Sequence, residues 1–191
     1  MDKNSLFRLA GWSAYVSAAA TIVGAVTLVI FFSVGDPYGK INDVSSIIIA
    51  ITGIIVLIAM RKFHRSTSYS LSVGASTLGI VALLVAGIVQ IIFVAGRIQY
   101  EQTEFVSPLG FGLFGIALIV FGYLGWIEAS RPRVLSAIGI TAGLGYVLVA
   151  AGFILGGPNH ILTYIGGALS VIAYPVWGFW LGRIWLQNAK G

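Results

Sequence analysis

Six long apolar stretches, separated by short polar segments, constrain the fold of this chain more than any other feature. They cover about residues 9–33, 42–60, 70–96, 105–127, 134–156 and 162–186. A transmembrane helix needs about 20 mostly apolar residues, each adding 1.5 Å of rise. Only 9% of the residues are charged, against roughly 25% in soluble domains. The sequence therefore predicts an all-α membrane protein, with a single domain over residues 1–191 that forms a six-transmembrane-helix bundle.

The positions of the cations predict the orientation of this bundle. Only Lys40 and Arg97 fall in outer loops if the chain starts in the cytoplasm. The other nine of the eleven Lys and Arg residues then lie in cytoplasmic segments: Lys3, Arg8, Arg61, Lys62, Arg65, Arg131, Arg133, Arg183 and Lys190. Cationic segments next to a transmembrane helix resist translocation. We therefore expect both termini on the cytoplasmic side (N-in/C-in).

Several classes of chemistry lack their usual residues. The chain has no cysteine, and no Asp, Glu, Lys, Arg or His lies near the middle of an apolar stretch. Ion pumps and proton-coupled carriers normally keep such groups inside the membrane. His64 and His160 are expected on opposite membrane faces, so they cannot share a zinc or haem. The sequence predicts no cofactor, no metal and no enzyme activity. Because the excess positive charge is explained by the cytoplasmic location of most Lys and Arg residues, it does not point to a nucleic-acid partner.

Glycines recur in the odd-numbered stretches. Each member of one set is followed thirteen residues later by a member of a second set: Gly11, Gly74 and Gly139, then Gly24, Gly87 and Gly152. This favours three repeated helical hairpins, with chance among 25 glycines as the alternative. GxxxG pairs also occur, at Gly139 and Gly143 and at Gly178 and Gly182. These pairs predict close helix packing, within the bundle in the favoured interpretation and across a dimer in the other.

Polar or distorted positions within the stretches are candidate ligand contacts. Gln90 needs partners for its amide, so we expect it to face the bundle, toward Tyr146 or a threonine, although it could instead contact a ligand. Pro175 cannot donate to the carbonyl of Val171, so a kink is expected there. Such a kink could open a pocket lined by Tyr174 or Ser170, and the alternative is a purely structural bend.

The outer rim holds the densest polar chemistry of the chain. It comprises Asp36, Asn42, Asp43, Arg97, Gln99, Glu101, Glu104, Asn159 and His160. Carboxylates with a histidine could bind a divalent cation or act as acid and base. The alternative is structural: Asn42 and Asp43 would form the cap and first turn of the second helix, and Glu101 and Glu104 would be solvated.

Cations cluster at the inner end of the second stretch, in Arg61-Lys62-Phe63-His64-Arg65. Each cation next to an anionic membrane surface contributes on the order of 1 kcal/mol to the free energy of binding to that surface. We therefore expect Arg61, Lys62 and Arg65 to contact anionic lipid headgroups, in addition to setting the topology.

Two segments resemble a known class of protein. They are Gly35-Asp36-Pro37-Tyr38-Gly39-Lys40-Ile41-Asn42-Asp43 and Tyr174-Pro175-Val176-Trp177-Gly178-Phe179-Trp180-Leu181-Gly182-Arg183. Both are similar to segments of uncharacterised six-helix integral membrane proteins of bacteria, which are grouped as families of unknown function. The resemblance implies a multi-pass protein of the bacterial inner membrane, and it implies no activity and no functional residues.

Three functions remain open at this point. The favoured one is a non-catalytic integral membrane protein, either an accessory subunit of a larger complex or a binder of lipid or another apolar ligand. The second is a small-solute channel, whose polar lining would come from Ser17, Thr21, Thr52, Thr77, Gln90, Thr141 and Tyr146. The third is an outer-rim enzyme built around Asp43, Glu101 and His160. A homo-oligomer is compatible with all three.

Overall fold

Six long helices and two short 3-10 turns account for nearly all of the computed structural model, which describes residues 2–128 and 132–189. The elements are α1 (Lys3–Val34), α2 (Tyr38–His64), α3 (Tyr69–Val94), η1 (Tyr100–Gln102), α4 (Val106–Glu128), α5 (Arg133–Gly156), η2 (Gly157–Asn159) and α6 (Ile161–Asn188). All six long helices are long and apolar enough to cross a membrane. The prediction of an all-α bundle of six such helices is confirmed. Arg131 and Lys190, which belong to the predicted cytoplasmic cations, lie outside the described residues.

The first two helices begin earlier than predicted. α1 starts at Lys3 because Asp2 caps it, with Oδ1 accepting a hydrogen bond from the Ser5 N–H at 2.6 Å. α2 starts at Tyr38, directly after Pro37. Asn42 and Asp43 therefore lie beyond its first turn, and their predicted role as cap and first turn is wrong. A helix satisfies its own backbone N–H and C=O groups. Where water is scarce, this favours a helix that begins further toward the N-terminus than the apolar stretch does.

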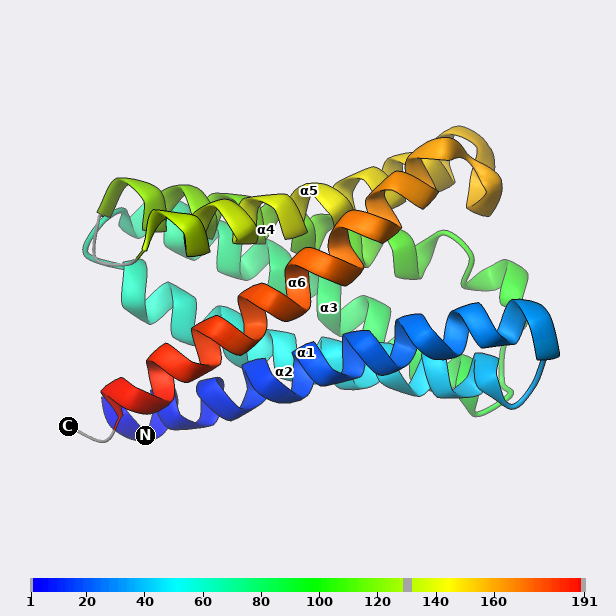
Figure 1. Cartoon of the computed structure of the whole chain (residues 1–191), viewed down its shortest axis with the longest axis horizontal. Helices are drawn as coiled ribbons and strands as arrows, with labels where there is room; N and C mark the ends of the chain where they lie inside the picture. Colours follow the sequence, from blue (N-terminus) through cyan, green and yellow to red (C-terminus); the bar gives the residue numbers. More distant parts are fainter. Residues whose placement is uncertain (1, 129–131, 190–191) are drawn as a thin grey trace.

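The turns at one end of the bundle depend on glycine. Gly35 ends α1 with φ +85°, and Gly157 ends α5 with φ +75°. This left-handed backbone region is costly for residues with a Cβ atom, so glycine is the usual residue where a helix stops this way. Both turns reverse the chain within a few residues, which makes α1–α2 and α5–α6 antiparallel hairpins (Figure 1).

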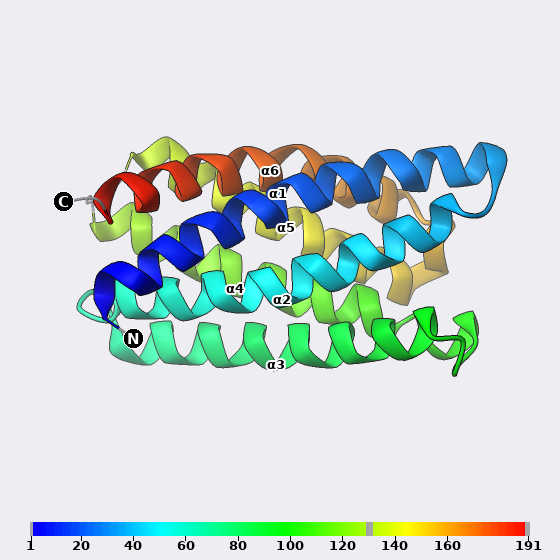
Figure 2. The same cartoon turned by 90° about the horizontal axis from the view of Figure 1, so that it is seen from below.

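The helices form a closed ring in chain order. Each helix packs against the next one, and α6 packs back against α1 (Figures 1 and 2). α1 begins and α6 ends at the same end of the bundle, which we call the terminal end (Figure 1). The α2–α3 turn lies there too, and the turns after α1, α3 and α5 lie at the opposite end. The described chain therefore consists of three helical hairpins.

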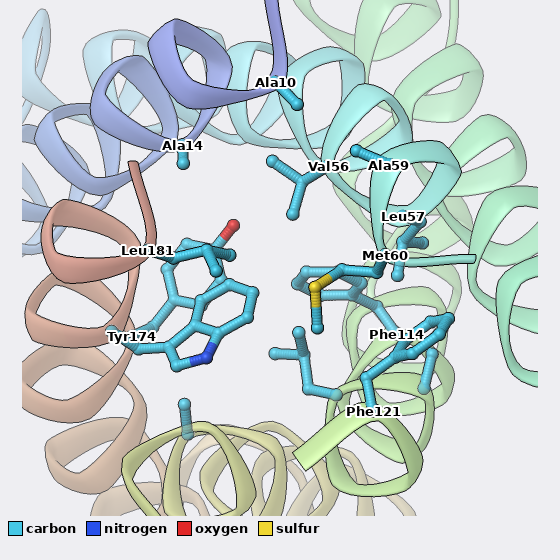
Figure 3. Close-up of a cluster of buried hydrophobic side chains, with 14 of the residues drawn as sticks. Ala10, Ala14, Val56, Leu57, Ala59, Met60, Phe114, Phe121, Tyr174 and Leu181 are labelled. Carbon is cyan, nitrogen blue, oxygen red and sulfur yellow. The ribbon is translucent and has the colours of Figure 1, made fainter. Parts of the chain in front are cut away.

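Large side chains fill the centre of this ring. Figure 3 shows Val56 and Met60 of α2, Phe114 and Phe121 of α4, and Leu181 of α6 gathered between the helices. All five are 2% exposed or less. The outward faces carry exposed Val, Ile, Leu and Phe along all six helices, as expected where lipid is the solvent.

The GxxxG glycines are used inside the bundle. A Cβ atom on Gly182 would lie 2.8 Å from the Gly11 carbonyl oxygen of α1, and one on Gly178 would lie 3.1 Å from that of Ala14. In α5, Gly139 faces Trp177 of α6, and Gly143 faces the Gly115 carbonyl of α4. These contacts agree with intramolecular packing rather than with a dimer face.

The glycines behind the predicted repeat occupy equivalent sites only in part. Gly24 packs on Ser45 within its own hairpin, whereas Gly87 packs on Ala50 of the preceding hairpin. Gly74 has no neighbour that a Cβ atom would meet within 4 Å, although Gly139, its counterpart, is covered by Trp177. Gly152 packs on Thr163 of its own hairpin, as Gly24 does on Ser45, so the glycine contacts agree with the repeat in the first and third hairpins at this position and not in the second.

Candidate functional site

A polar network crosses three helices at the opposite end of the bundle. Gln90 of α3 is 7% exposed. Its Nε2 donates to Oδ1 of Asp43 on α2 at 2.8 Å, and its Oε1 accepts from Ser107 of α4 at 2.9 Å. Gln90 faces the bundle as expected, but its partners are Asp43 and Ser107, not Tyr146 or a threonine. Tyr146 packs instead against Phe111, Phe114 and Tyr174, and the rotation of each helix about its axis cannot be derived from composition alone.

The remaining candidates of the outer rim take separate roles. His160 caps α6, because its Nδ1 accepts from the Leu162 N–H at 3.3 Å. Glu101 lies in η1 and is exposed, and Arg97 is exposed just after α3. None of these three is bonded to Asp43, which is held by Gln90. Over residues 2–128 and 132–189, no three His, Cys, Asp or Glu side chains are grouped so that they could hold a metal ion.

An aromatic cluster occupies the middle of the bundle. The rings of Phe114, Tyr146 and Tyr174 have centroids 5.6–5.8 Å apart, and Tyr174 also contacts Trp177 at 5.8 Å. The hydroxyl of Tyr174 lies 2.7 Å from Oγ of Ser17 on α1. Tyr174 is 1% exposed, so it is packed by its neighbours rather than lining a pocket next to Pro175. α6 continues through Pro175 as one helix.

Of the polar residues suggested for a channel, Ser17 and Tyr146 both contact Tyr174 in the middle of the bundle, and several others lie elsewhere. Ser17 is bonded to Tyr174, and Thr52 bonds the Ile48 carbonyl of its own helix at 2.7 Å. Thr77 and Thr141 line two separate depressions, between α3 and α4 and between α5 and α6. Within residues 2–128 and 132–189, the packed rings of Phe114, Tyr146 and Tyr174 occupy the middle of the bundle between these two depressions.

The larger depression is an apolar groove of about 480 Å³ between α3 and α4, which we call the α3–α4 groove. It is lined by Thr77, Leu78, Val81, Ala82, Val85, Val106, Leu109, Gly110 and Leu113. Ala82 and Gly110 are buried and form its floor. A Cβ atom on Gly110 would lie 2.7 Å from Cβ of Ala86 and 3.0 Å from the Ala82 carbonyl oxygen, so the two helices approach closely here.

The walls of the α3–α4 groove are bulky and exposed. Val81 is 54% exposed, and Val85 and Leu109 are exposed as well. Small residues on the floor and large ones on the walls leave a trough that opens outward, toward the lipid phase of a membrane. Val106 is the first residue of α4, so the trough begins at the opposite end of the bundle, next to the polar network at Ser107.

The terminal end holds a pair of residues that the sequence analysis did not connect. Nδ1 of His64, the last residue of α2, lies 2.7 Å from Oε2 of Glu128, the last residue of α4. The His64 side chain is fully buried, and that of Glu128 is 21% exposed. The His64 ring also contacts Phe63 and Phe121. One signal could have found the pair: Glu128 is one of two acids, with Asp2, among the cations of that side, and it lies at a helix end like His64.

Exposed cations surround this end. Arg61 and Lys62 point outward from the last turn of α2, and Arg65 follows them, with its guanidinium 5.1 Å from the ring centre of Tyr69. Arg8, Arg133 and Arg183 are exposed at the same end, on three other helices. The cations predicted to contact headgroups are thus accessible from outside the bundle.

Comparison with known proteins adds no relative. No family model matches the chain, no curated protein matches it, and no solved structure matches it. The similarity to six-helix bacterial membrane proteins therefore stays a prediction.

Proposed function

We propose that this protein is a non-catalytic integral membrane protein that binds a lipid acyl chain in the α3–α4 groove. One observation carries the proposal: an open apolar groove lies on the outside, between α3 and α4, while the centre is filled with side chains. Its volume of about 480 Å³ falls within the roughly 300–1,000 Å³ of typical ligand sites. Of the two non-catalytic roles, the groove favours lipid binding over that of an accessory subunit.

The proposed setting is the bacterial inner membrane, with the terminal end in the cytoplasm. Exposed Arg61, Lys62 and Arg65 would then meet anionic headgroups of the inner leaflet. The opposite end would face outward, and the α3–α4 groove would take a chain from the outer leaflet.

Two valine variants test the groove. Val81→Trp adds bulk to its wall, and Val26→Trp makes the same change on α1, where Val26 is 53% exposed against 54% for Val81. Protein extracted in mild detergent is analysed by native mass spectrometry. We expect lipid to remain bound to the wild type and to Val26→Trp, and to be lost from Val81→Trp. Equal lipid retention by all three proteins would overturn the proposal.

A further inference from the structure

The α3–α4 groove ends at the acidic side of the molecule. Four carboxylates, Asp36, Asp43, Glu101 and Glu104, and two cations, Lys40 and Arg97, belong to the opposite end. Lys40 lies 3.9 Å from Asp36, so these two charges offset each other. The other three carboxylates share this end with one further cation, Arg97, so negative charge is in excess there.

Two of these carboxylates are placed near the end of the groove. Asp43 is joined through Gln90 to Ser107, the neighbour of the groove residue Val106. Glu104 lies two residues before Val106 and is partly buried.

We infer that the α3–α4 groove selects lipids whose headgroup carries an ammonium group over lipids with a net negative headgroup. The inference rests on the proposed function, because it places the acyl chain in the groove. A chain lying along Leu113, Leu109 and Val106 brings its headgroup to the opposite end, where Glu104 precedes Val106 by two residues and Asp43 is joined through Gln90 to Ser107. An ammonium group is attracted there, and an anionic headgroup is repelled. The terminal end has the reverse preference, since its exposed side chains are cationic.

The test compares two lipids with identical acyl chains, phosphatidylethanolamine and phosphatidylglycerol. Each is titrated into delipidated full-length protein in detergent, and bound lipid is counted by native mass spectrometry. We expect phosphatidylethanolamine to bind the groove about fivefold more tightly at low salt, and the difference to shrink as salt rises. The groove contribution is the part of the binding that Val81→Trp removes and Val26→Trp leaves.

A charge variant checks the cause of the preference. Asp43→Asn with Glu104→Gln removes two charges and keeps the acceptor oxygen that Gln90 contacts. Asp2→Asn is the matched control, because it removes one exposed carboxylate at the terminal end and keeps a capping side chain. The headgroup preference should disappear in the double variant and persist in the control.

The outcomes separate this inference from the proposed function. If Val81→Trp loses both lipids but the wild type binds them equally, the groove binds lipid and the headgroup inference is overturned. If Val81→Trp binds both lipids like the wild type, the proposed function fails. If Val81→Trp instead disrupts association with another membrane protein while lipid binding is unchanged, the groove is a protein interface and both proposals are overturned.

Discussion

His64 and Glu128 join α2 to α4 through a contact of 2.7 Å between Nδ1 and Oε2, although α3 separates these helices in the ring. The His64 side chain is fully buried, and the contact lies at the terminal end. The His64 carbonyl also accepts a hydrogen bond from Oγ of Ser72 on α3 at 2.9 Å. One residue thereby connects the ends of three consecutive helices.

Removing either member of this pair is expected to destabilise the bundle. His64→Ala and Glu128→Ala should each lower the free energy of unfolding by about 1.5–3 kcal/mol, because a charge-assisted hydrogen bond is lost and its partner is left behind. The partial exposure of Glu128 favours the lower half of this range. Unfolding in mixed detergent micelles with increasing dodecyl sulfate measures the effect. The double variant should lose less than the sum of the two, and strict additivity would contradict a direct interaction.

Gln90→Leu should weaken the opposite end of the bundle. The change keeps the size of the side chain but leaves Asp43 and Ser107 without their bonds to the amide. Hydrogen bonds between transmembrane helices contribute about 0.6–1.7 kcal/mol each, and we expect a total loss of about 1–3 kcal/mol. Ser46→Ala is the control, since that hydroxyl donates to the Asn42 carbonyl of its own helix. A loss no larger than that of Ser46→Ala would argue against the network.

Gly182→Ala should disturb the crossing of α1 and α6. The added Cβ atom would lie 2.8 Å from the Gly11 carbonyl oxygen, so the two backbones must move apart. Gly167→Ala, on the same helix, meets no atom within 4 Å. We expect Gly182→Ala to lower the melting temperature in detergent, and Gly167→Ala to leave it unchanged or raise it, because alanine favours the helix by about 0.8–1.0 kcal/mol. The opposite order would show that this crossing is not closely packed.

Tyr174 is expected to keep the centre of the bundle closed. Tyr174→Phe should lose the bond to Ser17 and about 0.5–1.5 kcal/mol of stability. Tyr174→Ala should cost about 3–5 kcal/mol, because it leaves a cavity among Phe114, Tyr146 and Trp177.

Liposomes containing the wild type or Tyr174→Phe should swell in glycerol no faster than empty liposomes. Rapid swelling with the wild type would favour the channel hypothesis.

Single cysteines can test the membrane orientation directly, because the chain has no cysteine of its own. Arg65→Cys and Glu101→Cys each place a thiol at an exposed position, at the terminal and the opposite end respectively. In intact cells, a membrane-impermeant maleimide should label Glu101→Cys and leave Arg65→Cys unmodified until the membrane is opened. The reverse pattern would place both termini outside.

The helices were predictable because their signal is local. Each apolar stretch is long enough to span a membrane by itself, and all six became one helix each. The errors lie at helix ends. α2 begins at Tyr38, before the polar residues Asn42 and Asp43. A pattern that places a helix only where residues are apolar cannot show that the helix also includes the polar residues before them.

The candidate sites were predictable only in part. An amide such as Gln90 must face other helices rather than lipid, and it does so. By sequence, its partner Asp43 fits either an outer-rim site or the first turn of the second helix, and the distance between His64 and Glu128 along the chain hides their contact. Each bond joins residues at least 17 positions apart in the chain, on different helices.

The sequence by itself determined that this chain forms six helices long and apolar enough to span a membrane, because length and apolarity are properties of each segment alone. The tertiary structure decided the order of the ring, the aromatic filling of its centre and the position of the α3–α4 groove. It also decided the pairing of His64 with Glu128. These features depend on how each helix is rotated about its axis and on which helices meet. The physical reason is that rotation follows from close packing at residues such as Gly110 and Gly182, where small differences in side-chain size determine which faces can approach.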